Sequence, residues 1–423
     1  MTTTLNRPAD DRPTSRTAST VRTWQAKPGW HQVLWAVFAV SAVLGSVGLV
    51  WRFVGGHLPA GYGSYVPWGL WVAIYFHGVG IAAGAFAVSA LGHLLRLPGF
   101  VSPRSLRVAA VLVAASVLPA LLAVGLDLGQ MTRAWRIFVT PSFTSMMAFN
   151  SWAYVVLLAI CATVWWLSYR ADRGWLKPVL VLGVVISVMV PSQSGAFFGV
   201  VDAKPYWHSA LLPILLLVSA VTAGAATLLL VRAVLAAGQP DSSAERREAS
   251  AAVGVLRRVV LAGIGVYFVL EFAEFSVAWW NPQATAPELS LVLTGPYWWV
   301  FWGVHVALGG VLAAALLAAR RPPWWPVAAA VVAVAFLSTR LNVLVPGQAV
   351  GELDGLQAAY AHPRLDYVYH ATVMEYLVAL FCLALGMAIC YVGLRVSAAL
   401  ESSIPTIPRF PRISRKDHTD AVS

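Results

Sequence analysis

Long runs of apolar residues, separated by short polar segments, make up most of the sequence between residues 30 and 396. A helix needs about 20 apolar residues to cross the hydrocarbon core of a bilayer. Ten runs are near or above that length, so we predict an all-α integral membrane protein with ten transmembrane helices. The predicted spans are residues 30–54, 67–96, 105–128, 147–169, 177–200, 206–236, 253–280, 295–319, 323–346 and 368–396.

Composition supports this interpretation and excludes a water-soluble protein. Hydrophobic residues make up 59% of the chain and charged residues only 11%, and the mean hydropathy is +0.72. Residues 1–29 are polar and contain no short apolar core followed by a small-residue cleavage pattern, so we predict a retained, disordered cytoplasmic tail rather than a signal peptide. Residues 397–423 are predicted to form a second cytoplasmic tail.

The net charge of +11 alone would suggest binding to nucleic acid, but the basic residues lie at the ends of the predicted spans. Of the 29 Lys and Arg residues, 23 fall on the side of the membrane that holds both tails and five on the other side, and Arg340 lies inside a span. The excess of positive charge marks the cytoplasmic side. Both termini are therefore expected in the cytoplasm, and no nucleic-acid partner is expected.

Two segments of the chain repeat the same order of features. Residues 82–85 and 222–225 share a small-residue pattern at an offset of 140 residues, and Asp127 and Glu271 follow at an offset of 144. Because four spans separate the copies, both have the same orientation, which is typical of a parallel repeat. We predict two four-helix bundles, with one added helix at each end of the chain. The first bundle comprises residues 67–200, the second comprises residues 206–346, and the added helices comprise residues 30–54 and 368–396.

Small residues on the second span predict close helix packing. Gly80 and Gly84 stand four residues apart, where missing side chains let another helix approach. This pair supports the architecture and carries no chemistry.

A few ionisable residues fall inside the predicted spans, where each costs at least about 2.5–3.5 kcal/mol unless it has a partner, a wet cavity or a task. With the orientation above, they gather toward the non-cytoplasmic half of the membrane. They are His77, Asp127, Glu271, Glu274, His305, Arg340 and Glu375.

Three of these residues predict a salt bridge. Glu271 and Glu274 share a helix face, and Arg340 is the only cation inside a span that is not near its end, so a bridge within the second bundle is the simplest interpretation. In the first bundle, Tyr75 and His77 are expected at the same depth as Asp127. In the fifth span, the segment Pro191-Ser192-Gln193-Ser194-Gly195 interrupts the apolar run, which favours either a kink or one wall of a polar pocket.

The three cysteines provide no site for a redox metal. Cys161, Cys382 and Cys390 lie in apolar stretches and form no Cys-x-x-Cys pair. Any redox metal is therefore expected in a partner protein, with none in this chain.

Two long segments resemble the NrfD family, the quinone-interacting membrane subunits typified by polysulfide reductase. They are PWGLWVAIYFHGVGIAAGA and LDLGQMTRAWRIFVTPSFTSMMAFNSWAYV. The later segments SQSGAFFGVVDAKPYWHSALLPILLLVSA and TRLNVLVPG are similar to the ten-helix branch found with periplasm-facing hydrogenases. The resemblance covers roughly residues 30–396, and Gln130 departs from it where the family has a basic residue. The matched positions are Asp127, Leu128, Gly129, Trp135, Thr144, Ser145 and Trp152.

The resemblance implies a function. It implies a haem-free subunit of a respiratory oxidoreductase complex in the bacterial cytoplasmic (inner) membrane, without a catalytic metal of its own. Such a subunit exchanges two electrons and two protons between a quinone, menaquinone or ubiquinone, and an iron–sulfur protein on the outer face. The implied partners are a four-cluster ferredoxin-like subunit and a molybdopterin or hydrogenase catalytic subunit.

A quinol site needs an apolar slot, hydrogen-bond partners for two oxygens and a proton acceptor. We assign His77 as the hydrogen-bond partner and Asp127 as the proton acceptor, with Tyr75, Trp152 and Gln193 completing the pocket. The loop 130–146, together with residues 281–296 and 347–367, is expected to dock the partner. The docking side chains in that loop are Arg133, Trp135 and Arg136, and the predicted proton relay of the second bundle is Glu271, Glu274, Arg340 and Glu375.

Two other functions fit parts of the pattern. A secondary transporter also has duplicated bundles and charges near the middle of the membrane. A di-haem cytochrome b anchor needs pairs of axial histidines at matched depth, but only His77 and His305 lie well inside spans, with His93 near the end of one. Uptake by the purified chain would favour the transporter, and a Soret band would favour the cytochrome.

Overall fold

The computed structural model describes residues 29–403, apart from 281, 320, 352, 354, 356–358, 360, 361, 363 and 364. Within this part of the chain all regular secondary structure is helical, and ten segments are long and apolar enough to span a membrane. The predicted fold class and number of spans are therefore confirmed. Most of the two predicted tails lies outside the described residues. The spans are α1 (Trp30–Gly55), α2 (Leu70–Leu94), α3 (Pro103–Asp127), α5 (Met146–Leu167), α6 (Leu176–Gly199), α7 (Leu212–Ala237), α8 (Ala244–Trp280), η2 (Trp299–Leu312) with α10 (Ala313–Ala318), α11 (Trp325–Ala335) with α12 (Ser338–Leu344), and α14 (Val373–Ser403).

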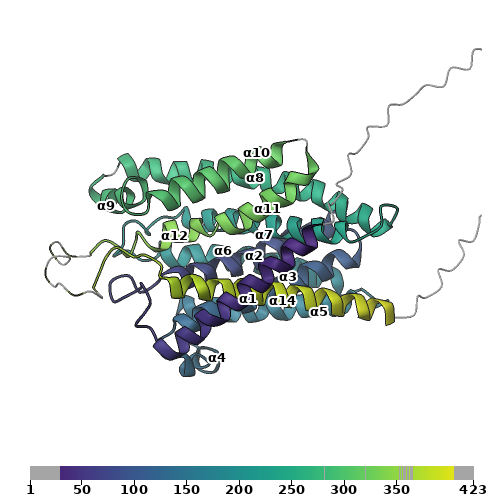
Figure 1. Cartoon of the computed structure of the whole chain (residues 1–423), viewed down its shortest axis with the longest axis horizontal. Helices are drawn as coiled ribbons and strands as arrows, with labels where there is room; N and C mark the ends of the chain where they lie inside the picture. Colours follow the sequence, from purple (N-terminus) through teal and green to yellow (C-terminus); the bar gives the residue numbers. More distant parts are fainter. Residues whose placement is uncertain are drawn as a thin grey trace, which may run out of the picture.

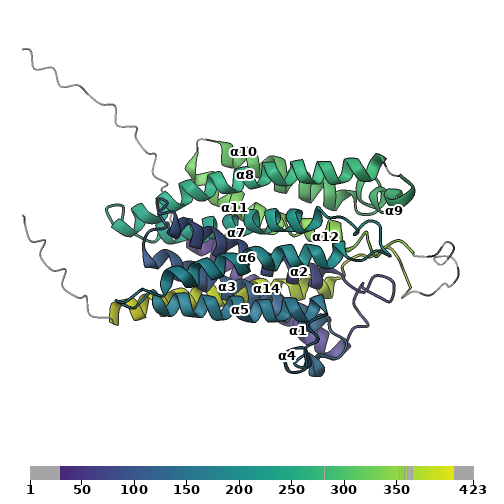
Figure 2. The same ribbon diagram turned by 180° about the vertical axis from the view of Figure 1, so that it is seen from behind.

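The spans lie side by side along the long axis of the molecule (Figure 1). One end, which we call the loop end, holds the short helices η1 (Met131–Arg133), α4 (Arg136–Val139) and α9 (Pro282–Leu293). The opposite end, the terminal end, holds the start of α1 and the end of α14. The view from behind shows α5 and α6 covering the face opposite α1 (Figure 2).

Helix α2 lies at the centre of the bundle and packs against α3, α6 and α7. Its contact with α7 depends on two glycines, because a Cβ on Gly84 would collide with the backbone of Ala220 and a Cβ on Gly224 would collide with that of Gly84 and Ala85. The close packing predicted for Gly84 is therefore confirmed. Gly84 and Gly224 are also the residues paired by the offset of 140, so equivalent positions of the predicted repeat face each other. The repeat itself stays a prediction.

The two added helices pack against each other. Helix α1 crosses α14 in Figure 1, and Gly45 and Gly48 of α1 lie directly against Phe381 and Leu377 of α14. Helix α14 also packs along α3. The added helices are thus attached to the first bundle, beside the end of α3.

Two spans extend further at the terminal end than their apolar runs predict. Helix α8 begins at Ala244 instead of residue 253, and α14 ends at Ser403 instead of residue 396. The extra turns carry acidic residues that find cations on α3. Glu245 pairs with Arg104, and Glu401 lies 2.6 Å from Arg107. These ion pairs therefore stabilise helical turns that lie beyond the apolar, membrane-spanning parts of α8 and α14.

Two spans depart from a regular α-helix, and a third contains a proline. The eighth begins with the π-helical segment η2, and the ninth is divided by a turn at Phe336 and Leu337. The fifth span, α6, remains helical through Pro191, and the Ser194 hydroxyl donates to the Val190 carbonyl at 3.0 Å. Such irregular backbone is tolerated inside a membrane protein where neighbouring protein groups satisfy it.

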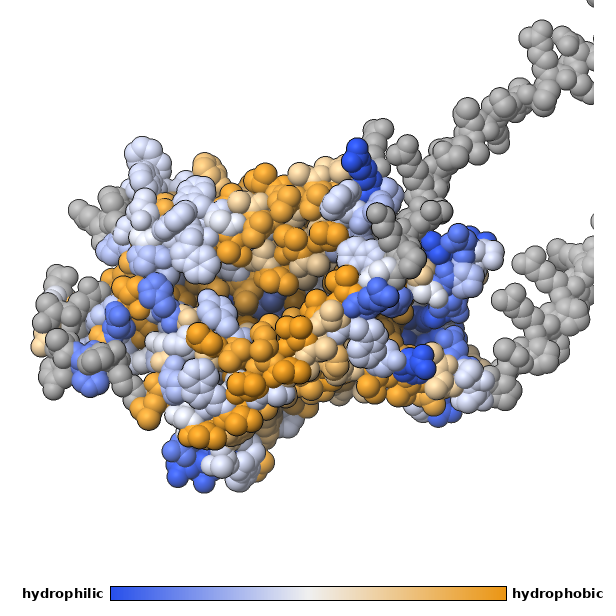
Figure 3. All heavy atoms as spheres, in the orientation of Figure 1, coloured by the Kyte–Doolittle hydropathy of each residue, from blue (hydrophilic) through white to orange (hydrophobic). Residues whose placement is uncertain are grey.

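On the face drawn in Figure 3, apolar residues cover the middle of the molecule and hydrophilic residues gather toward the two ends. Near the loop end, exposed tryptophans are frequent. Aromatic side chains of this kind are typical of the boundary between lipid and water, so the loop end is expected to reach that boundary. They are Trp279, Trp280, Trp298, Trp299 and Trp302.

Candidate functional site

A cleft of about 730 Å³ opens at the loop end, between the α1–α2 connection and the end of α3. Its volume is in the range typical of small-molecule sites. We call it the Asp127 cleft. It is lined by His57, Tyr62, Gly63, Ser64, Pro67, Trp68, Asp127, Leu128, Gly129, His362 and Leu365.

Asp127 is the last residue of α3 and the only residue of the predicted quinone pocket that lines this cleft. Its Oδ1 atom is buried, and no described residue forms a hydrogen bond with it. A buried carboxylate oxygen without a partner is costly. A ligand with a hydroxyl group would provide the missing donor.

His77 lies deeper in the membrane than Asp127, contrary to the expectation of equal depth. The neighbouring residue Gly78 lies against Ala120 and Ser116 of α3. Ala120 is seven residues before Asp127, which corresponds to about 10 Å along a helix. The imidazole of His77 is turned toward α11, where its Nε2 lies 2.7 Å from the Ala333 carbonyl oxygen.

Tyr75 faces the interior of the first bundle. Its hydroxyl lies 2.7 Å from the hydroxyl of Tyr154 on α5, a residue that the sequence pattern did not indicate. Gln193 lies on α6 beside Ser194, at the continuous helix described above. Neither Tyr75 nor Gln193 lines the Asp127 cleft.

Trp152 lies on α5 near the α4 loop, within 6.3 Å of Phe138 and 6.4 Å of Phe143, measured between ring centroids. Its indole N–H is buried and has no hydrogen-bond partner among the described residues. The roles of Tyr75, His77, Trp152 and Gln193 in quinone binding stay predictions, and the structure does not gather them with Asp127.

A second cluster of ionisable residues lies between α8, η2 and α12, within the predicted second bundle. The His305 Nε2 atom lies 2.9 Å from a carboxylate oxygen of Glu271, and its Nδ1 atom lies 3.0 Å from the Ser338 hydroxyl. Tyr267 donates a hydrogen bond of 3.1 Å to the other oxygen of Glu271. All four side chains are buried. We call Tyr267, Glu271, His305 and Ser338 the buried histidine network.

This network corrects the predicted salt bridge. Glu271 pairs with His305 rather than Arg340, and Glu274 accepts a hydrogen bond of 2.9 Å from Ser209. Arg340 is turned toward α2 and α7, where it donates to the Leu216 carbonyl at 3.2 Å. Its Nε and Nη1 atoms are buried without a partner among the described residues. The turn before α12 aims Arg340 away from the carboxylates of α8.

Glu375 does not belong to the second bundle. It begins α14, and its carboxylate accepts hydrogen bonds from the Gly61 N–H (2.9 Å), the Thr372 N–H (2.9 Å) and the Tyr369 hydroxyl (2.5 Å). The bond to Thr372 is one half of a capping box, which the sequence Thr-Val-Met-Glu could have revealed. Glu375 thus fastens the α1–α2 connection to the start of α14, and the structure separates it from the other three predicted relay residues.

The predicted docking residues lie on the short helices of the loop end. Arg133, Trp135 and Arg136 are all exposed, and the Arg136 guanidinium lies 5.9 Å from the Trp135 ring centroid. The other two predicted docking segments, 281–296 and 347–367, fall partly outside the described residues. The docking role stays a prediction.

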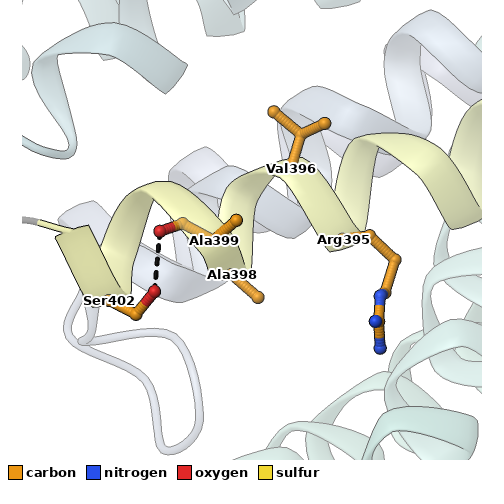
Figure 4. A pocket seen from close by; sticks show the side chains of 5 residues that line it. All are labelled: Arg395, Val396, Ala398, Ala399 and Ser402. Carbon is orange, nitrogen blue, oxygen red and sulfur yellow. Dashed lines mark hydrogen bonds between the residues drawn. The ribbon is translucent and has the colours of Figure 1, made fainter.

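A second hollow, of about 520 Å³, lies at the terminal end (Figure 4). Its lining comes from the last turns of α14 alone and includes Arg395 as its one charged group. No residue of the predicted sites lines it. The Asp127 cleft is therefore the better candidate for a functional site.

Comparison with known proteins identifies two relatives of similar length. A selenate reductase subunit from Mesobacillus selenatarsenatis is 25% identical over 389 residues, covering 82% of this chain and 89% of the relative. The Hdr-like menaquinol oxidoreductase integral membrane subunit of Archaeoglobus fulgidus is 25% identical over 354 residues, covering 80% and 87%. Both are named as subunits of oxidoreductases, so the transporter interpretation is not favoured.

The family model described as "Polysulphide reductase, NrfD" matches residues 60–351. This match includes Asp127 and most of the residues that line its cleft, the central helix α2 and the buried histidine network. It confirms the resemblance found in the sequence. Because the match covers more than half of the 423 residues, the chain belongs to the polysulphide reductase NrfD family of membrane proteins.

Proposed function

We propose that this chain is the quinone-reactive membrane subunit of a respiratory oxidoreductase complex, and that the Asp127 cleft is its quinone site. The observation that carries the proposal is the buried, unpartnered carboxylate oxygen of Asp127 in a cleft of about 730 Å³. The relative named as a menaquinol oxidoreductase subunit supports menaquinone as the carrier. The distribution of basic residues supports a bacterial cytoplasmic membrane with both termini in the cytoplasm and the loop end on the periplasmic side.

The residues of the cleft suit the chemistry of a quinol. A bound quinol supplies two electrons and two protons, and the electrons pass to the iron–sulfur clusters of a partner subunit. Asp127 accepts one hydroxyl proton at its free Oδ1 and releases it to water, because its cleft opens at the loop end. The second hydroxyl proton leaves directly to that water. Trp68 and Pro67 provide apolar surface for the ring.

The partner is expected to bind at the loop end, next to the cleft. Electron transfer requires the iron–sulfur clusters to approach the quinone, and the exposed arginines and aromatic rings of η1 and α4 are suited to an interface. Arg133, Trp135 and Arg136 are the proposed contact residues. A four-cluster ferredoxin-like protein is the proposed partner, with a molybdopterin enzyme or a hydrogenase as the catalytic subunit beyond it.

Replacement of Asp127 tests this proposal. General acid–base catalysis contributes about 10²–10⁴-fold, so Asp127→Asn should lower quinol oxidation by at least about 100-fold in membranes that contain the whole complex. Asp202→Asn is the matched control, because Asp202 lies at the same end of the protein and is exposed. Full turnover in Asp127→Asn would refute the assignment of the cleft.

A second proposal concerns proton translocation through the second bundle. It is favoured by the buried contact of Glu271 with His305, which η2 and α8 hold at 2.9 Å within the membrane. A π-helical turn often marks a functional site, and η2 carries His305. Glu274 and Arg340 lie on the same two helices as Glu271 and Ser338, and we propose them as further members of the relay. Glu375, the fourth predicted relay residue, lies apart from the other three. Its role in the relay requires that protons also pass along the start of α14.

Proteoliposomes that contain the whole complex separate the two proposals. Glu271→Gln should preserve quinol oxidation and reduce the number of protons translocated per electron. Glu401→Gln, an exposed glutamate at the terminal end, serves as the control. If the wild-type complex moves no protons while oxidising quinol, the relay proposal is wrong and the quinone site is unaffected.

A further inference from the structure

The wall of the Asp127 cleft contains a chain of hydrogen bonds that begins in α1. The buried guanidinium of Arg52 donates to the Leu126 carbonyl from Nε at 2.9 Å and from Nη2 at 2.7 Å. Leu126 immediately precedes Asp127, so Arg52 holds the end of α3 in place. The Arg52 Nη2 atom also lies 2.7 Å from Nε2 of His57, and the His57 Nδ1 atom lies 2.7 Å from the Tyr62 hydroxyl.

The chemistry of arginine fixes the direction of this chain. A guanidinium has only donors, so the His57 Nε2 atom must accept the hydrogen bond from Arg52. The neutral imidazole then carries its proton on Nδ1 and donates it to the Tyr62 oxygen. Because that oxygen already accepts a hydrogen bond, the hydroxyl hydrogen of Tyr62 is free to point elsewhere. Tyr62 lines the cleft.

We infer that Tyr62 donates a hydrogen bond to a carbonyl oxygen of the quinone in the Asp127 cleft, with His57 and Arg52 as positioning residues. This inference rests on the proposed function and assigns the second polar contact of the same site. A quinone carbonyl needs a donor and a quinol hydroxyl needs an acceptor. Tyr62 and Asp127 supply one of each.

Two further observations support this role. The Tyr62 ring packs edge-on against Trp71, with centroids 5.7 Å apart, which restrains the phenol. Burial raises the pKa of Tyr62 well above its usual value, and the nearby carboxylate of Asp127 acts in the same direction, although Arg52 partly opposes them. The hydroxyl therefore keeps its proton at neutral pH and remains a donor.

Binding of menadione, a naphthoquinone without an isoprenoid tail, tests the inference on the full chain in lipid nanodiscs. A hydrogen bond contributes about 1 kcal/mol, and 1.4 kcal/mol is tenfold in affinity. Tyr62→Phe should weaken menadione binding by about fivefold. Tyr65→Phe should not, because Tyr65 stacks on Tyr367 at a centroid distance of 4.2 Å and does not line the cleft.

Infrared spectra of bound menadione give a readout that a purely structural role would not change. One carbonyl band should be shifted in the wild-type protein and should return toward its free position in Tyr62→Phe. His57→Leu should restore part of the free band, because the phenol loses its positioning donor. Arg52→Lys should preserve most of the shift, since lysine retains a donor, and His208→Leu, at an exposed histidine of the loop end, should have no effect.

The outcomes separate this inference from the function on which it rests. If the wild-type chain binds no menadione, the proposed quinone site is wrong. If it binds menadione without a shifted carbonyl band, or if Tyr62→Phe binds equally well, only the role of Tyr62 is wrong. If Tyr62→Phe does not fold, the spectrum of His57→Leu decides the question, because an unchanged shifted band in that variant would contradict the role of Tyr62.

Discussion

The carboxylate of the Asp127 cleft and that of the buried histidine network differ in how far their oxygens are hydrogen-bonded. Asp127 lies at the end of a helix, beside a cavity, with one oxygen that has no partner among the described residues. Glu271 lies within α8, and its two carboxylate oxygens contact Tyr267 and His305. A satisfied carboxylate stabilises its surroundings, whereas an unsatisfied one is tolerated when it serves a ligand. The difference between the two regions is therefore the reason why the Asp127 cleft is the proposed binding site and the buried histidine network is not.

The largest expected effect is on stability, and it should occur in the second bundle. Glu271→Leu leaves His305 and Tyr267 without their acceptor, and removing one partner of a buried pair costs about 3–5 kcal/mol. Asp127→Leu removes a group with a free oxygen and should change the unfolding free energy by much less, within about 1 kcal/mol. Unfolding in mixed detergent micelles measures both variants. Equal losses would mean that Asp127 also has a structural role.

The sequence predicts the ten spans because a run of about 20 apolar residues has few alternatives to crossing a bilayer. It also indicates Asp127, since a charge at the end of an apolar run is conspicuous. It does not predict the partners of Glu271. The π-helical η2 and the turn before α12 change the directions in which His305 and Arg340 point. A regular helical period of 3.6 residues predicts neither irregularity.

The remaining residues of the cleft are missed for a different reason. His57, Tyr62 and Trp68 lie in the connection between α1 and α2, where no periodic pattern predicts which side chains meet. Arg52 is visible in the sequence as a basic residue at the end of an apolar run. Its contact with Leu126 spans 74 positions of the chain and depends on how α1 packs beside α3. Such a contact is fixed only by the tertiary structure.

A smaller effect is expected at Glu375, which anchors the α1–α2 connection without lining the cleft. Glu375→Gln keeps one acceptor oxygen and loses part of the cap of α14, and loss of a cap costs about 0.5–2 kcal/mol. The variant should unfold earlier and bind menadione slightly more weakly, because Gly61 lies in the same connection as Tyr62. Glu401→Gln, at the exposed end of the same helix, should change stability by less than about 1 kcal/mol. Equal behaviour of the two variants would contradict the capping role.

The smallest effect is expected at Glu288 of α9, which can be compared with both Asp127 and Glu271. Like Asp127 it is a carboxylate at the loop end, and its Oε2 atom is buried without a partner among the described residues. Burial raises the pKa of Glu288 above its usual value, although Lys204 partly opposes this. The folded protein therefore holds this proton more tightly than the unfolded chain, and its contribution to stability is lost as the pH rises above about 4.3.

Glu288→Gln removes this titration, so the variant should lose less stability than the wild type between about pH 5 and pH 8. The difference at pH 8 is expected to be about 1 kcal/mol, the lower cost of a buried group without a partner. Asp202→Asn, at an exposed carboxylate of the same end, should follow the wild-type curve. Parallel curves for Glu288→Gln and the wild type would mean that Glu288 stays ionised at no cost. If the curves differ as expected, an unsatisfied carboxylate at the loop end does not by itself make a binding site. The cavity beside Asp127 then distinguishes Asp127 from Glu288.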